Sequence, residues 1–157
     1  MVDGNGEKRI DTASKIIMAD AETIYLAFLD PALFASWLPP EGMSGQVDTF
    51  DAQVGGTYRM ILTYDQASFT GKTSENTDVY QGRFVELVPN ERIVQIVMFE
   101  SNDPAYSGEM TQKWLMQSLS EGTKVTVVCE DVPNGIRKED HQVGLTSTLE
   151  NLSKFVT

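Results

Sequence analysis

The feature that most constrains the fold is a long stretch of period-two hydrophobic alternation over residues 44–131, followed by one long helical pattern. In the first stretch, β-branched and aromatic residues alternate with polar ones between turn signals, as is typical of antiparallel strands. After residues 133–135 the hydrophobic period becomes 3.6. The apolar stripe of this last segment consists of Leu145, Leu149, Leu152, Val156 and, widening it, Phe155. We therefore expect an antiparallel sheet packed against a long C-terminal helix.

Three short turn signals divide the alternating stretch into hairpins. Gly55-Gly56 separates strands predicted at 46–51 and 57–64, because adjacent glycines suit a tight turn with positive φ. Pro89-Asn90-Glu91 separates strands predicted at 79–88 and 92–100. Residues 120–122 separate strands predicted at 109–119 and 123–131. The two longer connections, 65–78 and 101–108, are polar, and Phe69 and Tyr106 are their most conspicuous residues.

The segment before the alternating stretch predicts one strand and two short helices. Residues 8–18 are predicted as the first strand. Asp20 is a helix N-cap, and Asp30-Pro31 is a second cap with proline at the first helical position. Pro39-Pro40 ends the second helix.

Length and composition predict a single domain that binds neither nucleic acid nor membranes. The 157 residues, 41% hydrophobic, are enough for one core. We expect a flexible start at residues 1–6 and one domain over 7–157. A net charge of −11 disfavours phosphate-rich partners, and the longest apolar run has six residues, too few for a membrane span. With no signal-peptide pattern, the expected location is the cytoplasm.

The sequence contains a single cysteine, Cys129, and a single histidine, His141. This excludes an internal disulfide and the familiar Cys/His zinc sites. We predict no cofactor and no metal site, because phosphate-binding loops and metal-binding helix signatures are missing. Cys129 shares its strand face with Val125 and Val127, so a buried thiol is expected.

A sheet that curves around one helix is often not filled by it, so a cavity is expected between them. Strand alternation places Tyr58, Met60 and Leu62 on one face, which we interpret as the inner one. The Trp114 strand has two possible registers, with Trp114 and Met116 inward or Leu115 and Leu119 inward, and we favour the first. The predicted cavity lining is Trp37, Met43, Tyr58, Met60, Leu62, Phe84, Phe99, Trp114, Met116, Cys129, His141, Leu145 and Leu149.

His141 lies on the inner stripe of the last helix, four residues before Leu145. The positive end of the helix dipole disfavours its protonated form, so we expect a neutral imidazole. A structural role is the more common one for such a histidine, and contact with a ligand is the alternative. We predict no catalytic residue.

Three stretches, the last of them in two parts, resemble the family named for the activator of the Hsp90 ATPase, within the START-like, Bet v 1-like superfamily. They are IYLAFLDPALFASWLPPEGMSGQV, VGGTYRM, GTKVTVVCEDVP and DHQVGLTSTLENLSKF. The resemblance implies an α+β helix-grip fold: a curved antiparallel sheet wrapped around a long C-terminal helix, with two short helices after the first strand. It also implies an internal cavity.

Three functions remain open from the sequence. The first is a noncatalytic binding protein whose cavity holds a small hydrophobic or aromatic molecule. The second is an enzyme like the polyketide cyclases and aromatases, in which His141 or Tyr58 moves a proton. The third is a module that interacts with a chaperone. A monomer and a homodimer are both compatible with the sequence.

Overall fold

The structure, a computed structural model, describes residues 9–65 and 77–157. One seven-stranded antiparallel sheet has the order β1-β7-β6-β5-β4-β3-β2. The strands are β1 (Ile10–Ile17), β2 (Met43–Phe50), β3 (Thr57–Tyr64), β4 (Thr77–Val88), β5 (Arg92–Phe99), β6 (Met110–Leu119) and β7 (Gly122–Glu130). The helices are α1 (Ala21–Leu26), α2 (Pro31–Trp37), the short 3-10 helix η1 (Pro104–Tyr106) and α3 (Lys138–Val156).

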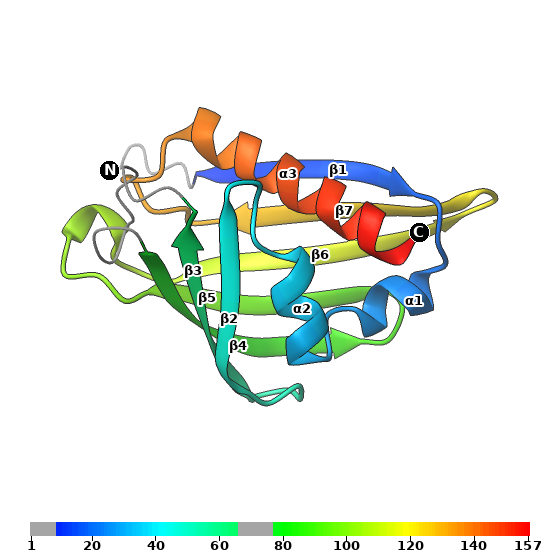
Figure 1. Ribbon diagram of the computed structural model, residues 1–157, viewed down its shortest axis with the longest axis horizontal. Coiled ribbons are helices and arrows are strands. Elements are labelled where there is room, and N and C mark those ends of the chain that lie inside the picture. The colour runs from blue at the N-terminus through cyan, green and yellow to red at the C-terminus, as the bar shows by residue number, and fades with distance from the viewer. Residues whose placement is uncertain (1–8, 66–76) are drawn as a thin grey trace.

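The predicted helix-grip fold is confirmed. The sheet curves so that β2 lies in front of β4 and β5 in Figure 1, and α3 runs along β1 and β7. α1 and α2 lie beside the C-terminal half of α3. We call the side of the sheet that faces α2 and α3 the concave face.

Local sequence signals explain the first helices and the hairpins. Asp20 accepts a hydrogen bond from the Thr23 amide at 2.8 Å, and Asp30 accepts one from the Ala32 amide at 2.9 Å, as expected of N-caps. Gly55, in the turn between β2 and β3, has a φ of +85°, which favours glycine. The first strand is shorter than predicted, and the expected flexible residues 1–6 and Phe69 lie outside the described ranges.

Hydrogen bonds fasten α3 to the segment that follows α2. The Thr148 hydroxyl donates to the Leu38 carbonyl at 2.9 Å, and the Asn151 amide donates to the Pro39 carbonyl at 2.8 Å. The stripe residues Leu145, Leu149 and Leu152 are buried. Phe155, predicted to widen that stripe, is instead 43% exposed, because it lies beyond the edge of the surface that α3 buries.

A close approach between β3 and β4 holds the Tyr58 ring in place. Tyr58 and Gly82 are register partners, and a Cβ built on Gly82 would lie 2.2 Å from Cε2 of the Tyr58 ring. Only a residue without a side chain allows the ring to lie flat against β4 at this position. Gly144 in α3 differs, because the nearest atom to a Cβ there would be Pro40 Cγ at 4.0 Å.

We therefore expect opposite effects from two glycine substitutions. Gly82→Ala should lower the free energy of unfolding by about 2 kcal/mol, because the Tyr58 ring must move. Gly144→Ala should raise it by about 0.5–1 kcal/mol, because alanine restricts the unfolded chain and fits the helix without a clash. Urea denaturation followed by circular dichroism measures both. Equal unfolding midpoints for Gly82→Ala and the unaltered chain would contradict the described contact.

Candidate functional site

The concave face has one tightly packed end, which we call the packed end. Its rings belong to Phe28, Phe34, Trp37 and Trp114. Trp37 and Trp114 cross edge to face, with centroids 5.8 Å apart, and both are buried. The Trp37 indole donates to the Ala27 carbonyl at 2.9 Å. This arrangement makes Trp37 a core residue, 1% exposed, whose remaining surface borders the larger of the two grooves described below.

The other end of the concave face is less completely buried, and we call it the accessible end. Leu62, Phe99 and Gln112 lie here on β3, β5 and β6, and each is only half-buried. Their neighbours Met60 and Cys129 are completely buried. These three side chains therefore keep some accessible surface on the concave face.

The structure places the remaining predicted lining residues on the inner side of the fold. Trp114 and Met116 face inward, and Leu115 on the other face of β6 is half-buried, so the favoured register is the observed one. Buried on this side are also Tyr58, Met60, Phe84, Cys129, Leu145 and Leu149. Met43 differs, because it lines a separate groove between α2, the start of β2 and the end of α3.

A line of hydrogen-bonded polar side chains crosses the concave face, and we call it the interior polar chain. Its members are Tyr80, Tyr58, Gln95, Gln112, Trp114 and Cys129. Gln95 is 1% exposed, although its neighbours on the inner side of β5, Ile93 and Val97, are apolar. A buried carboxamide is costly unless both its oxygen and its nitrogen have partners, and those of Gln95 do.

The direction of each hydrogen bond follows from the Trp114 indole, which can only donate. It donates to Gln112 Oε1 at 3.0 Å, and Gln95 Nε2 donates to the same oxygen at 2.8 Å. Gln95 Oε1 is then left to accept from the Tyr58 hydroxyl. The Gln112 nitrogen must point the other way, where its acceptor is Cys129 Sγ at 3.7 Å.

The titratable members of the chain are held in their neutral forms. Burial raises the pKa of Tyr58 well above 10, and the adjacent Tyr80 raises it further. Burial also raises the pKa of Tyr80, and it raises the pKa of the Cys129 thiol to about 12. None of these three groups is therefore a thiolate or phenolate nucleophile near neutral pH.

His141 belongs to a second polar cluster, which we call the ionic clamp. At its centre is Asp11 of β1, 1% exposed. Its carboxylate faces Arg9 Nη2 at 2.8 Å, Lys138 Nζ at 3.2 Å and His141 Nδ1 at 2.7 Å. Because a carboxylate only accepts, His141 Nδ1 carries the hydrogen. The clamp fixes the first turn of α3 onto the start of β1.

Three donors keep the clamp carboxylate ionised. Burial raises the pKa of Asp11, but hydrogen bonds from Arg9, His141 and Lys138 outweigh burial and lower the pKa to about 2. Arg9 also donates to the carbonyls of Pro133 and Ile136, so it joins β1 to the segment before α3.

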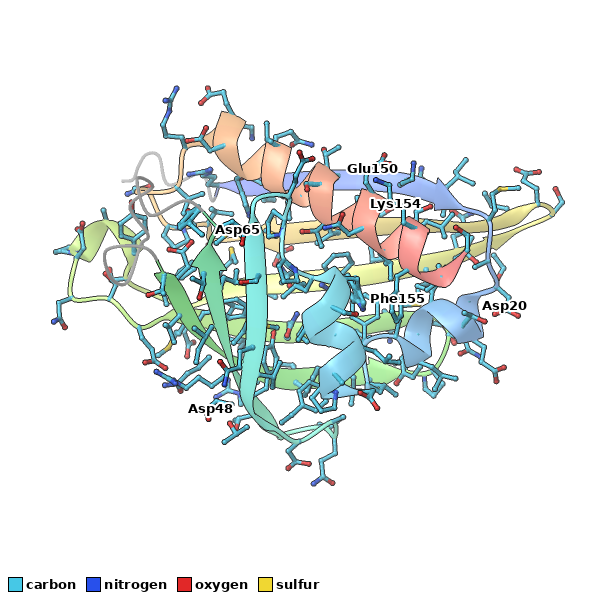
Figure 2. All side chains as sticks on the ribbon, viewed as in Figure 1. Asp20, Asp48, Asp65, Glu150, Lys154 and Phe155 are labelled. Atoms are coloured by element: carbon cyan, nitrogen blue, oxygen red, sulfur yellow. The ribbon has the colours of Figure 1, made fainter. Side chains whose placement is uncertain are left out.

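Two grooves lie along α3, apart from the interior polar chain. One, of about 600 Å³, lies between α2, β2 and the end of α3 and is lined by Pro39, Met43 and Phe155 among others. The second, of about 370 Å³, is lined by residues of α3 and by Glu41. Figure 2 shows Lys154 and Phe155 on the last turns of α3, beside these grooves. No member of the interior polar chain lines either groove.

Sequence reasoning missed the residues that organise both polar clusters. Gln95 is the one polar residue on an otherwise apolar strand face, which was a usable signal. Asp11 is likewise a polar residue on the inner side of β1, which it shares with Ala13. Their partners Gln112 and His141 are distant in the sequence, so pairing them required the three-dimensional arrangement.

Comparison with known proteins identifies relatives over most of the chain. The family model described as activator of Hsp90 ATPase homolog 1-like protein matches residues 18–157. A crystal structure of a protein from Chromobacterium violaceum is 33% identical, with a TM-score of 0.83, and the match covers 94% of this chain and 96% of that one.

A more distant structure shares the fold alone. The solution structure of the AHSA1-like protein from Aeromonas hydrophila is 17% identical, with a TM-score of 0.71 and coverage of 94% and 92% of the two chains. No curated protein matches the sequence. Within the described residues, no helix has the length and apolar character needed to cross a membrane.

The ionic clamp predicts a defined dependence of stability on pH. Asp11→Asn should lower the free energy of unfolding by about 3 kcal/mol at pH 7, because three donors then face a neutral amide. The Asp11 pKa is lowered from 3.8 to about 2. Its contribution to the free energy of unfolding is therefore complete above pH 5 and is lost as the pH falls to 2. The difference in the free energy of unfolding between Asp11→Asn and the unaltered chain should therefore shrink by about 2 kcal/mol from pH 5 to pH 2.

Urea titrations at several pH values measure this difference. The matched control is Asp48→Asn, which removes an exposed ion pair to Arg59 at 3.0 Å and should change stability by less than about 1 kcal/mol. A difference between Asp11→Asn and the unaltered chain that stays constant from pH 6 to pH 2.5 would show that Asp11 does not titrate as described.

Proposed function

We propose, from the premise that the chain belongs to the activator of Hsp90 ATPase homolog 1-like family, that it is a noncatalytic binding protein. Its ligand is a small hydrophobic or aromatic molecule held between α3 and the concave face of the sheet. The observation that carries this proposal is the accessible end, where Leu62, Phe99 and Gln112 are half-buried in front of a buried polar chain.

The side chains around the accessible end suit an apolar ligand. Leu62 and Phe99 present carbon surface, and Met110 adds a thioether that adapts to irregular shapes. A ligand that buries about 200 Å² of apolar surface here gains roughly 5 kcal/mol before the cost of association is subtracted. This is sufficient for a weak to moderate complex, and polar contacts would strengthen it.

Binding is favoured over catalysis because the groups that could move a proton are engaged elsewhere. The Tyr58 hydroxyl donates to Gln95, and burial raises the pKa of Tyr58 far above neutral pH. His141 Nδ1 faces the Asp11 carboxylate, which also binds Arg9 and Lys138. These contacts support structural roles for both residues, so neither is available as the acid or base of a cyclase-like reaction.

The proposal predicts that a neutral aromatic probe binds at the accessible end. We choose ethylnaphthalene because the net charge of −11 would repel anionic dyes. Probe at 100 times its Kd should stabilise the protein by about 2.7 kcal/mol, visible as a higher Tm. In ¹H–¹⁵N NMR spectra, the indole signal of Trp114 should shift, because its acceptor Gln112 lies at the accessible end.

Leu62→Trp should abolish this binding by filling the accessible end. The matched control is Val143→Trp, because Val143 is 69% exposed on the outer side of α3 and its replacement should leave affinity unchanged. Unaltered Tm and NMR spectra for a panel of neutral aromatic and aliphatic probes would overturn the proposed function. Equal loss of binding in both tryptophan variants would place the probe elsewhere.

A further inference from the structure

The Gln112 carboxamide has an unequal set of hydrogen-bond partners. Its oxygen accepts from Gln95 Nε2 at 2.8 Å and from Trp114 Nε1 at 3.0 Å, so both lone pairs are used. Its nitrogen has two hydrogens, and its acceptor among the described residues is the Cys129 sulfur at 3.7 Å. A thiol is a weak acceptor, so this nitrogen retains most of its capacity to donate.

The position of this nitrogen makes the imbalance relevant to a ligand. Gln112 is the half-buried member of the interior polar chain, whereas Gln95, Trp114 and Cys129 are each at most 1% exposed. Gln112 is therefore the residue at which the buried chain meets the accessible end, and its nitrogen faces the side of β7. Because Trp114 and Gln95 fix the oxygen, the side-chain amide cannot flip without breaking two hydrogen bonds.

We propose that the Gln112 amide N–H is the polar anchor for the ligand, which is a neutral, flat molecule with a carbonyl oxygen. This inference rests on the proposed function and specifies the chemistry of its site. An amide N–H donates well to a ketone, ester or amide oxygen, which replaces the weak sulfur acceptor with a strong one. The rest of the ligand then lies against Leu62 and Phe99.

The charges around the site favour a neutral ligand. From β3 to β6, the described inward-facing positions include no lysine or arginine, since Arg59, Arg83, Arg92 and Lys113 lie on the opposite face. The carboxyl group of Asp78 is buried on the inner side, 2% exposed. On the neighbouring strand β1 and on α3, the cations Arg9 and Lys138 are already paired with Asp11. A carboxylate or phosphate on the ligand would therefore lose its hydration without gaining an unpaired cation.

The aromatic residues around the site favour a flat ligand. The Tyr80 and Phe99 rings meet at 67° with centroids 6.0 Å apart, and Met110 on β6 is the register partner of Val97, two residues before Phe99. Ring edges and a thioether sulfur both make favourable contacts with an aromatic face. A flat ring with a carbonyl substituent uses these apolar contacts and the amide donor together.

Two probes of matched shape test this inference. Acetylnaphthalene and ethylnaphthalene, substituted at the same ring position, differ mainly in the carbonyl oxygen. We expect the chain to bind acetylnaphthalene roughly three- to tenfold more tightly in calorimetric titrations, the range for one net hydrogen bond. In Gln112→Met, the ratio of the two affinities should fall to about one. In Gln117→Met, which alters an exposed glutamine on the outer face of β6, the ratio should persist.

A measurement on the unaltered chain covers the case in which Gln112→Met fails to fold. The side-chain amide signals of Gln112 in ¹H–¹⁵N spectra should shift downfield with acetylnaphthalene and shift much less with ethylnaphthalene. Equal affinities for the two probes, or a preference that survives in Gln112→Met, would overturn the anchor and leave the proposed function intact. Failure of both probes to bind would overturn the proposed function, and the anchor with it.

Discussion

The buried indole N–H of Trp114 is the group on which the interior of this protein depends. It can only donate, and it is completely buried on the concave face, where an unmet donor would cost on the order of 1–3 kcal/mol. Gln112 supplies the acceptor, and that choice sets the direction of every later hydrogen bond through Gln95 to Tyr58. The polar atoms left facing the accessible end therefore follow from one donor deep in the core.

The position of α3 determines how much of the concave face stays accessible. Its first turn is fixed to β1 by the ionic clamp around Asp11, and its second half is fixed to the segment after α2 by Thr148 and Asn151. α3 therefore packs mainly against β1, at the opposite edge of the sheet from β2 and β3, and Leu62 and Phe99 are half-buried. The carboxylate that anchors the helix also holds His141 Nδ1. This contact favours a structural role for His141.

The fold could be predicted because its signals are local. The caps at Asp20 and Asp30, the glycine turn at Gly55 and the stripe through Leu145 each act within a few residues. The organisation of the site could not, because it depends on pairs that the sheet register brings together. Gln95 and Gln112 are 17 residues apart, and Asp11 and His141 are 130 apart. No spacing rule connects residues at such separations.

Native mass spectrometry of the protein purified without detergent tests the central claim most directly. The account predicts a second species that carries the mass of one small neutral molecule, lost on mild collisional activation and missing from Leu62→Trp prepared in the same way. It also predicts that purified carbonyl-containing aromatic molecules restore this species after it has been removed. Identical spectra for the unaltered chain and Leu62→Trp, with no added mass even after such molecules are supplied, would contradict the account.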